Sequence, residues 1–133
     1  TGGLDLDTGF GTGSADAAAE IRDEGSDFTL PNATNWLQQI SAINGNSMRQ
    51  VNDAFPDGFT FNDVTLKEFV TSFYENSPSF SNTNSNGDLV SDFVEVGDMF
   101  VVRSATIDYL IQVIEINTTD GDNSDNYVLN IKY

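Results

Sequence analysis

The sequence contains no cysteine and no histidine. Without cysteine, disulfides, thiolate nucleophiles and zinc–thiolate sites are excluded, and without histidine the usual general base near neutral pH is missing. A serine or threonine nucleophile would then need a lysine or an N-terminal amine as its base. No residues that flank Lys67 or Lys132 indicate such an arrangement. We therefore expect a protein that is not an enzyme and that needs no cofactor, with calcium as the open alternative.

Basic residues are scarce. Five lysines and arginines stand against 21 aspartates and glutamates, which gives a formal net charge of -16. This charge repels phosphate backbones and anionic membranes, so binding to nucleic acid or to a lipid surface is not expected. The partners that remain are cations, a neutral glycan, or a basic surface of another protein.

Long apolar runs are also missing, and no segment approaches the roughly 18 residues that a membrane span requires. The sequence begins with Thr1-Gly2-Gly3 rather than with methionine, as a processed mature protein does. We therefore expect an exported protein, secreted or held at the cell surface, with no membrane insertion of its own.

The 133 residues suffice for one domain with its own core. Residues 1–13 are rich in glycine and have little to bury, so they are predicted to be a flexible N-terminal segment. Residues 14–133 are predicted to be a single α+β domain, with helices first and strands last.

Four helices are expected in the first half of this domain. Apolar residues at helical spacing, capping residues and terminating glycine or proline residues indicate helices at about 14–24, 34–44, 47–55 and 65–76. The last has the clearest signal, because Thr65 and Glu68 can form a capping box between the apolar pair Val64 and Phe69.

The periodicity changes after a polar loop at residues 76–88. Segments rich in valine, isoleucine and tyrosine predict an antiparallel β-meander at about 98–104, 107–117 and 126–133. Since 107–116 is apolar on both faces, it is expected to be the central strand, covered by the helices on one side.

An Asp-rich loop, residues 120–126, places oxygen donors at alternating positions, as a hard cation such as calcium requires. Its candidate metal ligands are Asp120, Asp122, Ser124 and Asp125. An EF-hand loop that begins at Asp120 would need glycine at its sixth position and glutamate at its twelfth, where Asp125 and Ile131 stand. The same composition is also typical of a hairpin loop, and both readings stay open.

A second acidic cluster has aspartates at positions one, three and twelve of a window that runs into the first predicted helix: Asp5, Asp7 and Asp16. This pattern is similar to a calcium loop, although glycines occupy positions where further ligands would be expected. The alternative is a solvated linker.

Two further chemistries are compatible with the sequence. Glu68 and Glu75, seven residues apart on the helix predicted at 65–76, could form the carboxylate pair of a glycosidase. Trp36 or Tyr109, if exposed, could stack on a sugar, but Trp36 is expected to be mainly buried.

The closing segments Val96–Arg103, Tyr109–Val113 and Asn126–Tyr133 resemble the last strands of the HmuY-type surface lipoproteins of Gram-negative bacteria. In that family a strand that ends in arginine is followed by a strand that begins with tyrosine and, after an Asp-rich loop, by a tyrosine-rich strand. Family members bind haem through side chains that include histidine, which this chain lacks, so haem binding is not carried over. The resemblance implies an exported protein tethered by a lipid anchor upstream of Thr1.

These observations together predict a non-enzymatic, exported or cell-surface protein that acts as a binding module or as an accessory subunit of an outer-membrane assembly. Its long polar loops, 77–88 and 118–126, are the expected contact surfaces. A calcium-dependent structural or adhesion module is the first alternative. A carbohydrate-active enzyme with paired carboxylates is the second.

Overall fold

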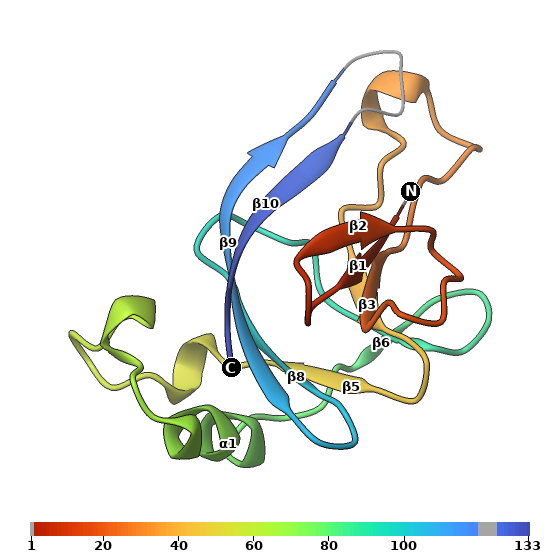
Figure 1. Ribbon diagram of the computed structural model, residues 1–133. Helices are drawn as coiled ribbons and strands as arrows, with labels where there is room; N and C mark the ends of the chain where they lie inside the picture. The colour runs from red at the N-terminus through yellow and green to blue at the C-terminus, as the bar shows by residue number, and fades with distance from the viewer. Residues whose placement is uncertain (1, 120–124) are drawn as a thin grey trace.

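The computed structural model of the protein describes residues 2–119 and 125–133, and in these residues the fold is mostly β (Figure 1). An N-terminal sheet has the strand order β2-β1-β3-β4, a larger sheet has the order β10-β9-β8-β5, and β6 pairs with β7. All pairs are antiparallel. The elements are β1 (Gly3–Asp5), β2 (Phe10–Thr12), β3 (Ile21–Asp23), η1 (Asn32–Thr34), β4 (Ile40–Ala42), β5 (Ser47–Gln50), η2 (Asn52–Ala54), η3 (Phe61–Asp63), α1 (Lys67–Glu75), β6 (Asn82–Thr83), β7 (Leu89–Val90), β8 (Met99–Arg103), β9 (Asp108–Asn117) and β10 (Asn126–Lys132).

The larger sheet forms the middle of the molecule. Its strands β9 and β10 are long and curved, and their register shifts between Val128 and Leu129. A β-bulge of this kind bends a strand and increases its twist. The N-terminal sheet lies on the concave side of this curve, and α1 packs against β8 and β9 from another side (Figure 1).

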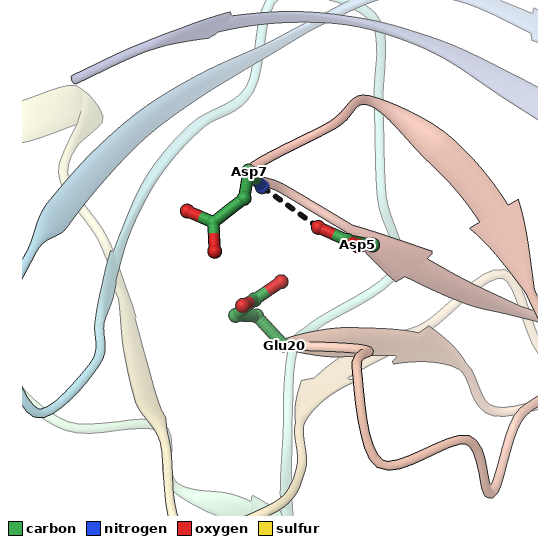
Figure 2. Close-up of side chains that lie close together, drawn as sticks. All are labelled: Asp5, Asp7 and Glu20. Carbon is green, nitrogen blue, oxygen red and sulfur yellow. Dashed lines mark hydrogen bonds between the residues drawn. The ribbon is translucent and has the colours of Figure 1, made fainter.

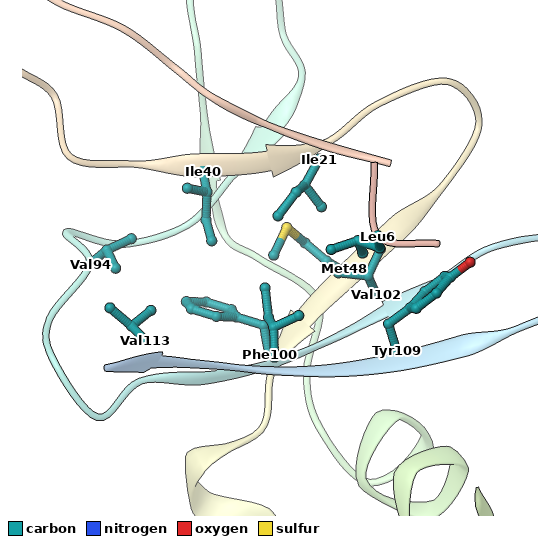
Figure 3. Packing of buried hydrophobic residues seen from close by; sticks show 10 residues of the cluster. Leu6, Ile21, Ile40, Met48, Val94, Phe100, Val102, Tyr109 and Val113 are labelled. Atoms are coloured by element: carbon teal, nitrogen blue, oxygen red, sulfur yellow. The ribbon is translucent and has the colours of Figure 1, made fainter. Parts of the chain in front are cut away.

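The middle of β8 and residues 109–111 of β9 are buried. Since successive side chains of a strand point in opposite directions, both faces of the sheet are covered there. Phe100, Val102 and Ile111 face one apolar cluster, which is completed by Leu6, Ile21 and Ile40 from the N-terminal half (Figure 3). Val101 and Leu110 face a second cluster, with residues of α1 and of the segment before it. The apolar character of both faces therefore follows from two separate cores.

The N-terminal hairpin depends on a glycine. A Cβ atom at Gly3 would lie 2.5 Å from the carbonyl oxygen of Gly13 and 2.6 Å from Oγ1 of Thr12, distances that only glycine avoids. Leu6, which follows β1, is almost fully buried in the core. The glycine-rich start of the chain, expected to be a flexible segment, thus pairs as β1 and β2 in the described residues.

The predicted α+β architecture, four N-terminal helices packed on a small C-terminal meander, is wrong. Residues 14–24 form turns and then β3, 34–44 contain β4, and 47–55 form β5 and a short 3-10 helix. In each segment pairing with a distant strand replaces the local helical preference: β3 pairs with β1 and β4, and β5 pairs with β8. The meander itself is present, with β9 between β8 and β10 and with β5 added at its edge.

The α-helix α1 lies within the predicted range 65–76, but it begins differently. Its N-cap is Leu66 and no side chain caps it. A capping box occurs instead at η3, where Thr60 and Asp63 bond reciprocally. The helix buries Val70, Phe73 and Tyr74, whereas Phe69 of the predicted apolar pair is exposed, as is Leu66. The buried face of α1 is therefore on the side of the helix that carries Tyr74, and not on the side predicted from Phe69.

No helix among residues 2–119 and 125–133 combines the length and the apolar character that a membrane span needs.

Candidate functional site

A groove of about 650 Å³ lies between the two sheets, a volume typical of ligand sites. Its walls are β1 and β3 of the N-terminal sheet on one side and the start of β10 on the other. We call it the aromatic groove, since its lining includes Phe28, Trp36 and Tyr127.

The three aromatic side chains differ in exposure. Trp36 and Tyr127 are half-buried and in contact, with ring centroids 4.9 Å apart at a 44° tilt. Phe28, by contrast, is 81% exposed. A mostly exposed phenylalanine in the same groove as a half-buried aromatic pair offers apolar ring surface to a ligand at little conformational cost.

Asp23, at the end of β3, orients this pair. Nε1 of Trp36 lies 3.1 Å from each of its carboxylate oxygens, the backbone N–H of Gly25 donates to Oδ2 at 3.2 Å, and the Tyr127 hydroxyl donates to Oδ1 at 3.4 Å. Burial raises the pKa of Asp23 more than these hydrogen bonds lower it. Burial and the nearby Asp23 carboxylate also raise the pKa of Tyr127, which keeps its hydroxyl protonated as a donor.

Glu24, the next residue, ties the groove wall to its neighbours. It accepts hydrogen bonds from Arg22 at 3.0 Å, from Ser41 at 2.7 Å and from Asn84 at 2.7 Å. Burial would raise the pKa of Glu24, but the hydrogen bonds from Asn84, Ser41 and Arg22 outweigh it, so that the pKa is lowered. This carboxylate therefore stays ionised and holds the β3 end, β4 and the β6–β7 hairpin together.

The structure brings together three carboxylates elsewhere: Asp5, Asp7 and Glu20 each place an oxygen within 4.8 Å of the others (Figure 2). Asp5 accepts the backbone N–H groups of Asp7 and Thr8, and Glu20 accepts that of Leu6 at 2.7 Å. Asp7 accepts the hydroxyl hydrogen of Tyr109. These bonds to the protein account for the arrangement of the cluster.

The cluster corrects the predicted set of Asp5, Asp7 and Asp16. Asp16 instead accepts the backbone N–H of Ala18 at 2.9 Å in an exposed turn, and Glu20 takes its place. Because residues 14–24 form turns and a strand rather than a helix, the twelfth position of the assumed loop points elsewhere.

Of the predicted metal ligands in the Asp-rich loop, Asp120, Asp122 and Ser124 lie outside the described residues. Asp125 is described. It accepts the backbone N–H of Thr119 at 2.7 Å and lines the aromatic groove. The start of β10 therefore belongs to the groove wall, and calcium binding by the loop stays a prediction.

The other candidates do not assemble into a site. Glu75 forms an ion pair with Arg103 at 2.7 Å, while Glu68 lies exposed in the first turn of α1. Tyr109 is buried and cannot stack on a sugar. Trp36 is half-buried, so less of it is covered than expected.

Sequence reasoning missed Phe28, Tyr127 and Asp23 as groove residues. Phe28 and Trp36 lie on either side of η1 in the sequence. This closeness in the sequence is the signal that could have placed both in the groove. Tyr127 lies 104 residues from Asp23, and no local pattern joins the two.

No protein-family model matches the chain, and no match was found among curated proteins or among solved structures. The resemblance of the C-terminal strands to the HmuY-type lipoproteins stays a prediction.

Proposed function

We propose that the chain is a non-enzymatic binding module, exported to the cell surface or secreted, which takes a neutral carbohydrate in the aromatic groove. The observation that carries this proposal is the exposure of Phe28 in the same groove as the Trp36–Tyr127 pair, a groove whose wall also holds Asp23. The acidic composition and the resemblance of the C-terminal strands to exported lipoproteins support the location.

Carbohydrates suit this combination of groups. The C–H bonds on one face of a sugar ring carry a slight positive charge, and they pack on the electron-rich faces of aromatic rings. The sugar hydroxyls need polar partners, and the groove supplies carboxylates and hydroxyls in its wall, among them Asp125 and Ser26. A purely apolar ligand would leave these polar groups without partners.

The charge of the chain decides against an anionic glycan. The net charge is -16, and the cation in the groove lining, Arg22, is already paired with Glu24 at 3.0 Å and lies 3.6 Å from Asp88. An anionic sugar would be repelled at long range and would find no uncompensated arginine. The ligand is therefore an uncharged sugar.

The test is a fluorescence titration with neutral polysaccharides: a glucan, a mannan, a galactan and a xylan. Trp36 is the only tryptophan of the chain, so its emission reports on the groove. At least one polysaccharide should shift the emission saturably, and Phe28→Ala should weaken that binding about tenfold, a loss of about 1.4 kcal/mol. The polysaccharide should not be shortened on long incubation.

Phe10→Ala is the matched control, because Phe10 is 73% exposed and its side chain is not part of the groove lining. Both variants should fold like the parent, since neither removes buried surface. Equal effects of the two substitutions, or no response to any polysaccharide, would overturn the proposal.

A further inference from the structure

A second groove, of about 420 Å³, lies between the end of β10 and the start of α1. Residues 64–67 and Val70 line it on one side, and Ile131, Lys132 and Tyr133 line it on the other. We call it the basic groove, because its lining holds both lysines of the chain and no aspartate or glutamate. In a chain with a net charge of -16, this groove is a local exception.

Strand β10 is an edge of the larger sheet, and β9 is its one neighbour among the described strands. The backbone of Val113, in β9, bonds to residues 97–98, which lead into β8. Backbone groups alternate in direction along an antiparallel strand, so the next residue, Gln112, faces its partner Asn130 in β10. By the same alternation, Ile131 points its N–H and C=O groups to the outer edge of the sheet.

This outer edge is open at the basic groove. Within residues 2–119 and 125–133, no hydrogen bond joins the outer backbone groups of Ile131 to another segment. The Ile131 side chain packs on the first apolar cluster, whereas Val70 belongs to the second, on the other face of the sheet. Ile131 therefore presents its backbone to the groove. A free strand edge of this kind is a template for another extended chain.

The groove also contains an uncommitted positive charge. Arg22 and Arg103 form ion pairs with carboxylates. Arg49 and Lys132 donate to backbone carbonyl oxygens. Lys67, which is exposed, has neither kind of partner in the described part of the chain. It is therefore available to a carboxylate that enters the groove.

We propose that the basic groove binds an extended, acidic segment of another protein, which adds to the larger sheet as a strand beside β10. Main-chain hydrogen bonds to Ile131 hold the segment, as in other complexes formed by strand addition. A carboxylate of the segment pairs with Lys67. Its alternate side chains pack on Leu66 and Tyr133, which are 54% and 56% exposed.

The charge of the groove favours this occupant over a second copy of the chain. Two copies would each carry a net charge of -16. The edge strand of a second copy, residues 126–133, would bring Lys132 and no carboxylate side chain to Lys67. An acidic segment of a partner meets the lysine directly, and the other charges of the chain are screened beyond about 8 Å at physiological ionic strength.

The probe is a positional-scanning library of fluorescently labelled hexapeptides, at an ionic strength of about 0.15 M. Polarisation should be highest for the sets that fix aspartate or glutamate at one position, and lowest for those that fix lysine or arginine. The best peptide should bind at least about tenfold more weakly when a backbone nitrogen that bonds to β10 is methylated. Methylation of the next nitrogen along the peptide should leave the affinity unchanged.

Amide hydrogen exchange tests the strand edge itself. In the free protein the amide of Ile131 should exchange faster than that of Asn130, which faces β9. The best peptide should slow the exchange of Ile131 at least about tenfold, because its amide then has a partner.

Lys67→Gln should weaken the acidic peptide about threefold, as for an exposed ion pair, and should not affect a version of the peptide with an amide in place of the carboxylate. Asn86→Asp is the matched control. It changes the net charge equally, at an exposed position outside the groove, and should weaken the acidic peptide much less. Both variants should fold like the parent, since neither removes buried surface.

Three results would overturn the proposal: no set of the library binds, acidic sets are not preferred, or methylation shows no alternation along the peptide. Protection of Ile131 that rises with protein concentration in the absence of peptide would assign the edge to a second copy, and would overturn it as well. The emission of Trp36 reports on the aromatic groove, so carbohydrate binding is tested separately.

Discussion

Trp36 donates its indole N–H to Asp23, and Nε1 lies 3.1 Å from both carboxylate oxygens. The only tryptophan of the chain is thus coupled to an aspartate whose pKa is raised, since burial disfavours the charged form more than the hydrogen bonds favour it. Protonation of Asp23 changes the charge directly beside the indole. Tryptophan emission therefore reports on this carboxyl group.

We predict that Trp36 emission titrates with a midpoint above the ordinary aspartate pKa of about 3.9, and that Asp23→Asn abolishes the transition. Because the folded-state pKa is raised, protonated Asp23 contributes stability that is present at low pH and is lost as the pH rises through that pKa. The measurement is an emission titration with circular dichroism to verify folding. Asp27→Asn is the control, because hydrogen bonds from Thr29 lower the pKa of Asp27. A midpoint at or below about 3.9 in the parent, the ordinary aspartate pKa, contradicts the prediction.

Glu24 should show the opposite pH dependence. The pKa of Glu24 is lower in the folded state than in the unfolded state. Its contribution to stability is therefore fully present at a pH above the ordinary glutamate pKa, and it is lost as the pH falls through the folded-state pKa. Glu24→Gln should lower the free energy of unfolding by about 1.5–3 kcal/mol near neutral pH, as for bonds to a charged group. Urea unfolding at neutral and at acidic pH measures this, and the difference from the parent should shrink in acid. Glu68→Gln, at an exposed position, should change stability by less than about 0.5 kcal/mol.

The second core predicts a large cost for Leu110→Ala. Leu110 is fully buried on the face of β9 that meets α1, and removing such a side chain costs about 2–5 kcal/mol. Ile114→Ala, on the same strand but 43% exposed, should cost less than about 1 kcal/mol. Urea midpoints of the two variants compare them directly. Equal costs would show that α1 does not cover this face.

The cluster of Asp5, Asp7 and Glu20 predicts that Asp7→Asn stabilises the protein at low ionic strength. Asparagine still accepts the Tyr109 hydroxyl hydrogen while one of three neighbouring negative charges is removed. The melting temperature should rise by roughly 2–4 °C, and sodium chloride should reduce the gain through screening. Asp57→Asn, in an exposed turn, is the control.

A melt in calcium, compared with sodium chloride of the same ionic strength, tests the cluster further. Equal shifts in both salts are expected when the effect is screening alone. A rise specific to calcium that Asp7→Asn removes would contradict this expectation and assign the cation to the three carboxylates.

The sequence predicted those elements whose pattern is long and unambiguous. The nine residues of α1 have an apolar stripe, and β9 is a ten-residue strand with a double-sided apolar run. The helices predicted at 14–24 and 47–55 are wrong because both segments have ambiguous patterns. The alanines of 14–24 are compatible with a helix or a turn, and the three spaced apolar residues of 47–55 are compatible with a helix or a short strand. Hydrogen-bonded pairing with strands that are distant in the sequence decided against the helices.

The candidate site was less predictable than the fold. Trp36 was considered for sugar stacking only if exposed, and it was expected to be mainly buried. Asp23 and Tyr127 become its neighbours only when β3 and β10 face each other. The acidic cluster was predicted in part, with Glu20 in place of Asp16. Both differences come from strands that were expected to be helices, since a strand and a helix direct the same side chain differently.

The sequence by itself determined the negative charge, the absence of thiol and imidazole chemistry, the helix near residue 70 and the strands of the C-terminal meander, because composition and a strong period need no partner. Only the tertiary structure decided that the first half of the chain is β, that the central sheet has a core on each face, and that Phe28, Trp36 and Tyr127 share a groove. The physical reason is that strand pairing and burial are satisfied by residues far away in the chain, which local sequence patterns do not encode.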